Sequence, residues 1–470
     1  MACQHPRTIR RRWNATKLAT VTAVLLVICL TSRGADSPRR VSIGDGSGYL
    51  SYPEVQATLK LQPGDTLYIN PGTYSGLSLG NLSGTAAQPI TVRCDPQTVF
   101  TTTIPQVNTF PNVAHVRFVG FRFETYKSTC LKITGRSHDL LFQDFTLRDV
   151  SGYSFYVYDP AKVFDGTKES TFYNFKWEHV LIDGKTDGAA ICNLNYSLSN
   201  MISVVLDFEV SRCTFRHFDN TVQAFPVIGL ERCFNLHVHD CTFTDIGMAE
   251  SPIGHNVCIC VAGYVHAHSN RFSRQWANDV RVWPMQLNAL GYNGPEAVNR
   301  FYNNISWEKR KYPMYEHNQV RQADLDKSSG YLSRTSSEVC FNTLFRSRKA
   351  ASSKDPYVGM LVDVYGPDVT IKHNLVIEPE ADVPFAPTRN YVVHLGAGPQ
   401  SGLVVDNNLV FPTWAEAGLT DTETFRPLKT SPARDAATGR IGHITEDHYH
   451  HDRYQGAAAD VGAVEGPVGE

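Results

Sequence analysis

Two stretches, Phe208-Glu-Val-Ser-Arg-Cys-Thr-Phe215 and Leu236-His-Val-His-Asp-Cys-Thr-Phe243, are copies of one pattern. In each copy the first, third, sixth and eighth residues are apolar, so apolar and polar residues alternate within each half. Alternation with a period of two predicts a short strand with one buried face. The two polar residues between the halves break the alternation as a tight bend does. The pattern therefore predicts a strand, a bend and a second strand.

Further copies of this pattern recur along the chain. They begin at Val116, Leu140, Phe175, Val265, Arg300, Val339, Val369 and Leu403. A spacing of roughly 24 to 38 residues is typical of repeat proteins, in which one unit cannot bury its apolar face alone and stacking creates the core. The sequence thus predicts an all-β, single-stranded, right-handed parallel β-helix. An antiparallel sandwich or barrel is the alternative, but the Asn-Gly and Asp-Gly hairpins that it requires are scarce.

Stacking predicts two columns of equivalent residues. We expect an inward column formed by Phe121, Phe145, Val180, Cys213, Cys241 and Ile305, and a polar corner column formed by Asn304, Asn342, His373 and Asn407. Stacked strands place Cys213 and Cys241 about 5 Å apart. Because the cysteines have no regular spacing, buried thiols are the favoured state there, and one disulfide bridge is the alternative.

The first 35 residues have the layout of a secretory signal. A basic start from Arg7 to Lys17 precedes a mainly apolar run from Leu18 to Leu30, and small residues follow up to Ala35. The apolar run is too short for a comfortable membrane span. We therefore expect an exported protein that is secreted, periplasmic or on the cell surface. Retention as an N-terminal anchor is the alternative, because Arg33 makes a poor cleavage site.

Removing this segment makes the chain acidic. Six of the 44 basic residues lie within it, so 38 remain against 46 acidic residues, a net charge of −8. This balance excludes nucleic-acid binding by bulk charge. We expect a monomer without membrane contact after signal removal, with one β-helix domain at 36–425 and a capping tail at 426–470.

Two segments resemble known proteins. Leu61-Gln-Pro-Gly-Asp-Thr-Leu-Tyr-Ile-Asn-Pro-Gly-Thr-Tyr74 and Gln88-Pro-Ile-Thr-Val92 resemble the N-terminal turns of right-handed β-helix polysaccharide lyases of the alginate and chondroitin lyase type. The segment from Ser51 to Lys60 is expected to be a helix that caps the open end. Near the other terminus, Leu428–Asp435 and Asp460–Glu465 are similar to tails of secreted bacterial β-helix proteins. This resemblance implies a bacterial, extracytoplasmic protein and a cap that closes the last coil.

A third short strand opens each coil, and its composition changes along the chain. Up to Val261 these strands are nearly all apolar, whereas from Asp279 onward they carry aromatic, charged and histidine residues. Polar groups that a core does not need indicate a groove on the outer face. A polysaccharide could lie across several coils there. The candidate substrate-binding residues are Trp283, Lys311, Asp363 and Tyr365.

The same strands supply candidate catalytic residues. On a uronate substrate, β-elimination needs a base and a cation that neutralises the carboxylate. His317 or Tyr315 could be the base, and Arg281 the cation, with His317 as the best single candidate. Alternation places Tyr315 and His317 together on the outer face and Glu316 on the other. Hydrolysis would instead use carboxylates one or two coils apart, for which Asp279, Glu316 and Asp363 are available.

The resemblance to lyases does not extend to their catalytic motif. Asn270-Arg-Phe-Ser-Arg-Gln275 resembles the stretch that precedes acidic calcium ligands and a catalytic lysine in those enzymes. At the matching places only Asp279 is acidic, no lysine lies between Arg271 and Val298, and the family's arginine would fall near Glu316. Calcium is thus only a candidate cofactor.

The sequence therefore leaves three hypotheses. The leading one is a secreted polysaccharide lyase that acts on an acidic, uronate-containing polysaccharide. The second is a glycoside hydrolase that uses paired carboxylates on the same face. The third is a surface β-helix that binds glycans without cleaving them.

Overall fold

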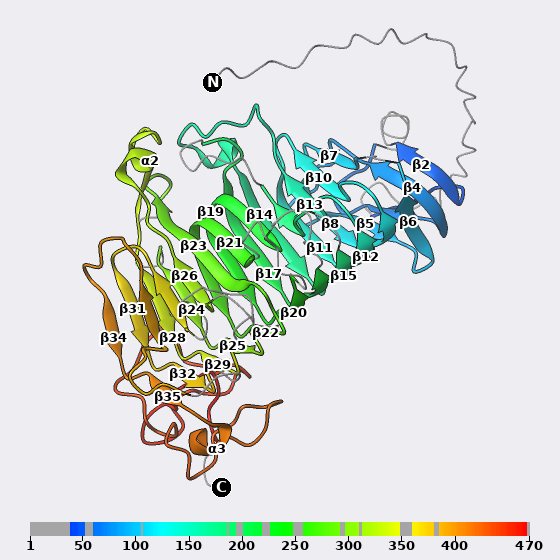
Figure 1. Cartoon of the computed structure of the whole chain (residues 1–470). Coiled ribbons are helices and arrows are strands. Elements are labelled where there is room, and N and C mark those ends of the chain that lie inside the picture. Colours follow the sequence, from blue (N-terminus) through cyan, green and yellow to red (C-terminus); the bar gives the residue numbers. More distant parts are fainter. Residues whose placement is uncertain are drawn as a thin grey trace, which may run out of the picture.

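The computed structural model describes residues 38–51, 60–104, 107–185, 188–193, 201–218, 226–247, 257–291, 297–309, 313–347, 360–379 and 385–467. In these ranges the chain forms two large sheets of parallel strands, and helices are few and short. Strands from successive turns of the chain stack beside one another, which makes the protein a parallel β-helix (Figure 1). The predicted parallel architecture is confirmed, while its handedness and single-stranded winding stay predictions. Residues 52–59 of the expected cap helix, Ser51 to Lys60, lie outside the described residues, as does the export segment 1–35.

The strands form three series, two in the larger sheet and one in the smaller sheet. The first series is β1 (Arg40–Ile43), β3 (Thr66–Ile69), β5 (Ile90–Cys94), β8 (Ala114–Val119), β11 (His138–Gln143), β14 (Phe172–Glu178), β17 (Val205–Ser211), β19 (Ile228–His239), β21 (Val257–His268), β24 (Asn299–Tyr302), β28 (Ser337–Cys340), β31 (Val369–Lys372) and β34 (Val404–Asp406). The second series, in the smaller sheet, is β2 (Ser47–Ser51), β4 (Gly72–Ser78), β6 (Thr98–Thr102), β9 (Arg122–Tyr126), β12 (Thr146–Val150), β15 (Leu181–Lys185), β18 (Thr214–Phe218), β20 (Thr242–Ile246), β22 (Arg271–Ser273), β25 (Ile305–Trp307), β29 (Thr343–Phe345), β32 (Leu375–Ile377) and β35 (Leu409–Phe411). The third series is β7 (Thr109–Pro111), β10 (Leu131–Thr134), β13 (Phe155–Val157), β16 (Ile191–Cys192), the first halves of β19 and β21, β23 (Asn278–Leu287), β26 (Tyr315–His317), β30 (Val362–Val364) and β33 (Val393–Leu395).

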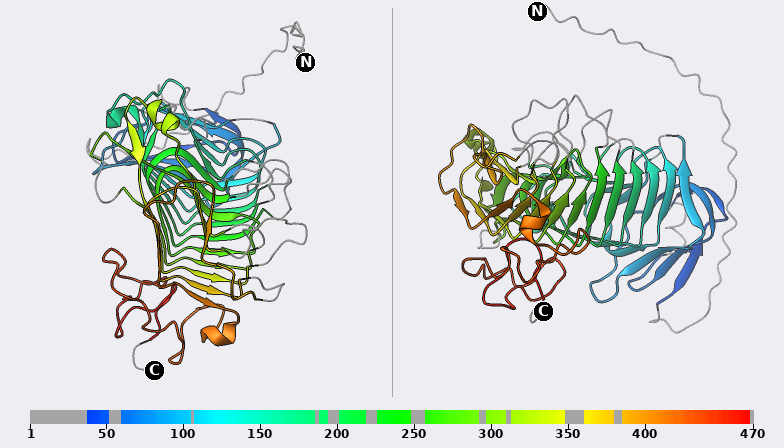
Figure 2. Two further views of the ribbon diagram at one scale, coloured as in Figure 1. Left: turned by 60° about the vertical axis from the view of Figure 1, so that its left-hand side comes forward. Right: turned by 60° about the horizontal axis from the view of Figure 1, so that its bottom comes forward.

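The first and third series belong to one sheet because β19 and β21 are long enough to serve both. The first half of β19 pairs with β16 and its second half pairs with β17. Figure 2 shows the coils as regularly spaced ribbons along the stack. Outside the series, β27 (Leu332–Arg334) pairs antiparallel with β23, and the short helices are η1 (Lys168–Ser170), α2 (Gln322–Asp326) and α3 (Trp414–Ala417).

From β8 onward, each bend from the first to the second series contains one residue in the left-handed backbone region. These residues are Gly120, Asp144, His179, Arg212, Asp240, Ser269, Asn303, Phe341, His373 and Asn407, with φ between 48° and 75°. Non-glycine residues rarely adopt this conformation, although Asn, Asp and His adopt it more readily than most. The residue that follows the bend then points inward. Successive strands of the second series are in parallel register, so the inward residues stack.

We call this stack the inner corner column. Its members are Phe121, Phe145, Val180, Cys213, Cys241, Asn270, Asn304, Asn342, Asn374 and Asn408. The column begins with aromatic rings, Phe121 and Phe145 being stacked 4.9 Å apart, and continues through the free thiols of Cys213 and Cys241. It ends as an asparagine ladder in which each Oδ1 accepts from the backbone N and Nδ2 of the asparagine one coil earlier, at 2.8 to 3.0 Å.

Five expected members of the inward column are confirmed, and the expected polar corner column is partly wrong. Asn304 and Asn342 lie in the inner corner column, but His373 and Asn407 are the left-handed residues that precede it, and they bond to each other at 2.7 Å. The assignment of Ile305 to the inward column is wrong for the same reason. Asn304 fills that column position, and Ile305 lies one residue after it. A slip of one residue at a bend moves a side chain from one column to the next.

The C-terminal tail runs back along the side of the stack. Its apolar residues, such as Phe425 and Ile444, pack with Phe341 and Ile377 in one buried cluster. The buried Arg453 donates to the carbonyl oxygens of Asp460, Gly462 and Ala463 and to Asn303 Oδ1. Val404 and Val405 of β34 are 41% and 43% exposed, and closure of the last coil by the tail stays a prediction.

Truncating the aromatic part of the inner corner column should destabilise the protein. Phe145 is 1% exposed and stacks on Phe121. We expect Phe145→Ala to lower the free energy of unfolding by about 3–5 kcal/mol, because the stacked coil cannot collapse around the cavity. Val163→Ala, at a 55% exposed position, is the control and should change it by less than about 0.5 kcal/mol. Urea denaturation measures both, and equal effects would contradict the stacking.

The asparagine ladder should be structural. Asn304 is fully buried, donates to the carbonyl oxygens of Ala267 and Tyr302, and accepts from Asn270. Asn304→Ala leaves these groups without partners, so we expect a loss of at least about 2 kcal/mol in unfolding free energy. Asn408→Ala, at the half-buried end of the ladder, should cost less. Unchanged stability in Asn304→Ala would refute the ladder's role.

Candidate functional site

One outward column of the third series carries a run of ionisable side chains. Strand register places Cys260, Arg281, Glu316, Asp363 and His394 beside one another on β21, β23, β26, β30 and β33. Their sequence neighbours Val280, Val282, Val362 and Val364 face the core. Because side chains alternate across a strand, the ionisable residues must point outward. We call Arg281, Glu316, Asp363 and His394 the acid column.

Contacts within the acid column form two linked pairs. Arg281 Nη2 donates to Glu316 Oε2 at 2.7 Å, and Asn278 Nδ2 donates to the same oxygen at 2.5 Å. On the next two strands, His394 Nδ1 lies 2.9 Å from Asp363 Oδ1. The side chains of Arg281 and Glu316 are 9% and 12% exposed, whereas that of His394 is 25% exposed. The column is therefore most accessible at its histidine.

The environment separates the two carboxyl groups chemically. Burial raises the pKa of Asp363, and the nearby charge of Glu316 raises it further, against hydrogen bonds from His394 and Tyr365 that lower it. Glu316 instead accepts two hydrogen bonds, one from the Arg281 guanidinium and one from the Asn278 amide. The two carboxyl groups thus have different partners, an imidazole at Asp363 and a guanidinium with an amide at Glu316.

The expected positions of Tyr315 and His317 are reversed. Tyr315 and His317 are in register with Val280 and Val282, so both face the interior. Both bond to Ser337 Oγ, Tyr315 from its hydroxyl at 2.8 Å and His317 from Nδ1 at 2.9 Å. Burial lowers the pKa of His317 to about 4. The prediction that they act together as base and acid on the outer face is wrong, and Glu316 takes the outward position instead.

Asp279 also belongs to the interior. Its Oδ1 lies 2.5 Å from Lys309 Nζ, both side chains are fully buried, and Lys309 also donates to the carbonyl of Ala277. Burial raises the pKa of Asp279 to about 6, with Lys309 opposing the rise. A carboxylate neutralised in this way does not suit the calcium-ligand role that the resemblance implied. The pair ties the start of β23 to the loop after β25.

Only some of the remaining predicted binding residues lie near the acid column. Tyr365 hydrogen-bonds Asp363 through its side chain and so joins the acid column. Trp283 is half-buried and lies beside Ala262 of β21, two residues beyond Arg281. Lys311 lies outside the described residues.

Sequence analysis missed His394, Asn278 and Lys309. The signal for His394 was present, because it alternates with Val393 and Leu395 on a strand whose core face is known from Val362 and Val364. Lys309 lies in a loop after β25 and carries no periodicity, so its pairing with Asp279 depends on packing alone.

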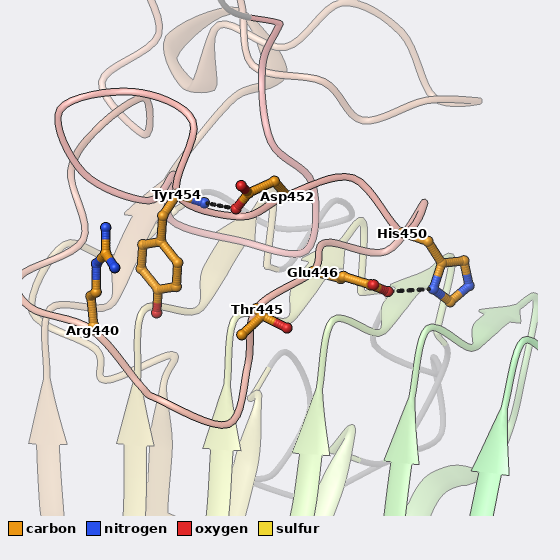
Figure 3. Close-up of a pocket in the computed structure, with 6 residues that line it drawn as sticks. All are labelled: Arg440, Thr445, Glu446, His450, Asp452 and Tyr454. Carbon is orange, nitrogen blue, oxygen red and sulfur yellow. Dashed lines mark hydrogen bonds and ion pairs between the residues drawn. The ribbon is translucent and has the colours of Figure 1, made fainter.

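A cavity of about 440 Å³ lies apart from the acid column, at the C-terminal tail. Figure 3 shows the side chains that line it, which are those of Arg440, Thr445, Glu446, His450, Asp452 and Tyr454. His450 also reaches the corner between β19 and β20, where its Nε2 lies 2.8 Å from Asp240 Oδ1.

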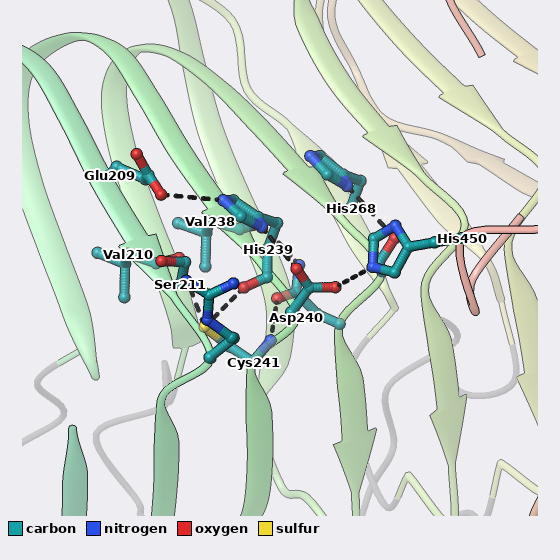
Figure 4. Close-up of polar contacts among 12 residues, drawn as sticks. Glu209, Val210, Ser211, Val238, His239, Asp240, Cys241, His268 and His450 are labelled. Atoms are coloured by element: carbon teal, nitrogen blue, oxygen red, sulfur yellow. Dashed lines mark hydrogen bonds and ion pairs between the residues drawn. The ribbon is translucent and has the colours of Figure 1, made fainter. Parts of the chain in front are cut away.

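His450 extends a polar network on the outer face of the first series. His239 Nδ1 lies 2.7 Å from Asp240 Oδ2, and its Nε2 lies 3.3 Å from Glu209 Oε1 (Figure 4). Burial lowers the pKa of His239, but hydrogen bonds to Asp240 and Glu209 outweigh it and raise this pKa to about 9. The hydrogen bond to His239 is the main cause that lowers the pKa of Glu209 to about 2. Polar and charged side chains of this network thus connect the C-terminal tail to the stacked coils.

The strand pairings define the class to which the chain belongs, the parallel β-helix proteins. No protein-family model matches the chain, and no curated protein matches it. Among the described residues, none of the helices combines the length and apolarity needed to cross a membrane.

Polysaccharide lyases are among the solved structures to which the chain is similar. A PL6 family alginate lyase, AlyGC, is 12% identical with a TM-score of 0.34, over 78% of this chain and 51% of that chain, so the chain spans about half its length. Pectate lyase Pel9A is 14% identical with a TM-score of 0.29, over 92% of this chain and 97% of that one. The Streptococcus pneumoniae surface protein and adhesin PfbA is 9% identical with a TM-score of 0.34, over 74% and 89%. At these values the likeness carries nothing about the chemistry of this chain.

The stability that the His239 network contributes should fall as the pH rises. The raised pKa of His239 means that its charge adds stability fully below its unfolded value of about 6.5, and this stability is lost as pH rises through about 9. We expect the unfolding free energy of the wild type to exceed that of His239→Gln at pH 6 and the gap to close near pH 9.5. Denaturation at several pH values measures it. His217→Gln, at a half-exposed histidine, is the control, and a constant gap would contradict the network.

Proposed function

We propose that the chain is a secreted enzyme that cleaves a polysaccharide bound along the third series of strands, at the acid column. The observation that carries the proposal is the succession of a guanidinium, two carboxyl groups and an imidazole on consecutive strands, all on one outer face. A core does not need these groups. The rise of about 4.8 Å between strands lets neighbouring sugar units meet neighbouring side chains.

β-Elimination on a uronate unit is the leading reaction, in line with the sequence resemblance to alginate and chondroitin lyases. His394 is the base, because a proton on Nδ1 that is donated to Asp363 leaves the basic lone pair on Nε2. Arg281 neutralises the substrate carboxylate. Trp283 and Tyr365 provide flat faces for sugar rings.

Hydrolysis is the second candidate, and the carboxyl pair favours it. Glu316 and Asp363 are register partners on adjacent strands, a spacing close to the roughly 5–5.5 Å of retaining glycosidases. Asp363, with its raised pKa, would protonate the leaving oxygen, and Glu316, held by Arg281, would be the nucleophile. Glycan binding without cleavage is the third outcome.

A screen of uronate polysaccharides, with and without a chelator, tests the proposal. Elimination produces an unsaturated uronate that absorbs in the ultraviolet, whereas hydrolysis produces reducing ends without that absorbance. We expect His394→Ala to lower kcat/KM by about 10²–10⁴-fold and Arg281→Ala by about 10²–10³-fold. The chelator arm shows whether the reaction needs calcium.

The control variant is Lys132→Ala, which removes a charge from the same outward column at its far end on β10. It should keep full activity and an unchanged thermal midpoint. If His394→Ala is fully active while Glu316→Gln and Asp363→Asn are inactive, hydrolysis replaces elimination. Binding without any product would support the non-catalytic function, and neither binding nor product would refute the proposal.

A further inference from the structure

A second left-handed column lies at the corner between the third and first series. Its members are His115, Asp139, Asn174, Asp207 and Asn235, with φ between 51° and 66°. Strand register aligns them on β8, β11, β14, β17 and β19. Their short polar side chains bond along the column, Asn174 to Asp139 at 2.6 Å and Asn235 to Asp207 at 2.9 Å. His115 replaces the asparagine or aspartate of the other coils.

Two histidines and one carboxylate converge at this end of the column. Asp139 Oδ2 lies 2.5 Å from His138 Nδ1 and 3.6 Å from His115 Nδ1. The ligand atoms of the three residues all lie within 4.8 Å of one another, and no other set of three or more His, Cys, Asp or Glu in the described chain meets this condition. We propose that His115, His138 and Asp139 bind a borderline divalent cation, with Zn²⁺ as the expected ion.

The donor set and its spacing suit this ion. Imidazole nitrogen and carboxylate oxygen are both ligands that Zn²⁺ binds, at about 2.0–2.2 Å. In a tetrahedral site such ligands lie roughly 3.3 Å apart. The separation of 3.6 Å between His115 Nδ1 and Asp139 Oδ2 matches this value. The shorter separation, between His138 Nδ1 and Asp139 Oδ2, increases when the cation replaces the hydrogen bond. Hard cations such as Ca²⁺ prefer oxygen ligands alone.

The surroundings hold the ligands in place. Asn174 Nδ2 donates to Asp139 Oδ1 and so leaves Oδ2 directed at the two histidines. Tyr173 stacks on the His138 ring with centroids 4.6 Å apart. Such outer contacts orient metal ligands. The three side chains are 25% to 27% exposed, so water or an oxygen of a bound molecule can complete the coordination.

Metal titration of the full chain tests the site. Chelator-treated protein is titrated with Zn²⁺ by calorimetry, and Co²⁺ is added separately because its visible absorption reports nitrogen ligands and coordination number. The variants are His115→Asn and Asp139→Asn. Asparagine already occupies this column at Asn174 and Asn235, so both variants keep a side chain that accepts the left-handed backbone. Circular dichroism confirms that they fold.

The matched control is His217→Asn. His217 also has a left-handed backbone (φ 55°) and lies near two carboxylates, Asp183 and Asp245, but among the described residues it belongs to no group of three ligand atoms within 4.8 Å. We expect wild type and control to bind one equivalent with the same affinity and Co²⁺ spectrum, and His115→Asn and Asp139→Asn to bind it at least about 100-fold more weakly. Equal binding by all four proteins, or an equal loss in the control, would overturn the proposal.

Discussion

The structure depends on a backbone constraint that recurs at fixed places in the coils. At the corner between the first and second series from β8 onward, and at part of the corner between the third and first, one residue has positive φ. That conformation turns the strand direction without interrupting the pairing on either side. It also determines which of the two bend residues faces the interior, and thereby which side chains of the following strand face inward. Residues as bulky as Phe341 and Arg212 accept this conformation, which indicates that the stack, more than local preference, imposes it.

The inner corner column divides the stack into two chemically different halves. Near the N-terminus it is filled by phenylalanine, and beyond Cys241 it is filled by asparagine that satisfies its own hydrogen bonds. The change coincides with the start of the polar outward residues at Arg281. The half with the asparagine ladder thus also carries the acid column outside and the tail alongside. Buried amide ladders demand fixed geometry to be satisfied, which suits a surface that must hold charged groups in register.

The sequence could predict the parallel stack, because apolar alternation is a local property that each copy displays. It could also predict that Arg281 faces outward, since Val280 and Val282 flank it. It could not predict the faces of Tyr315, Glu316 and His317, because three consecutive polar or amphipathic residues give no apolar reference. Their register with β23 determines which of them face the interior. Pairs such as Asp279 with Lys309 depend on loops packing in three dimensions, and no pattern in the sequence encodes them.

The position of Arg453 bears on the order in which parts of the chain can pack during synthesis. Its guanidinium bonds to Asn303, 150 residues earlier, and is fully buried there. At about 5–20 residues per second, a ribosome needs roughly 8 to 30 s to make the intervening chain. Over that interval the side of the coils around β24 and β25 is exposed without its partner. Until the tail is made, the apolar residues that it covers, such as Phe341 and Ile377, have no tail residues to pack against.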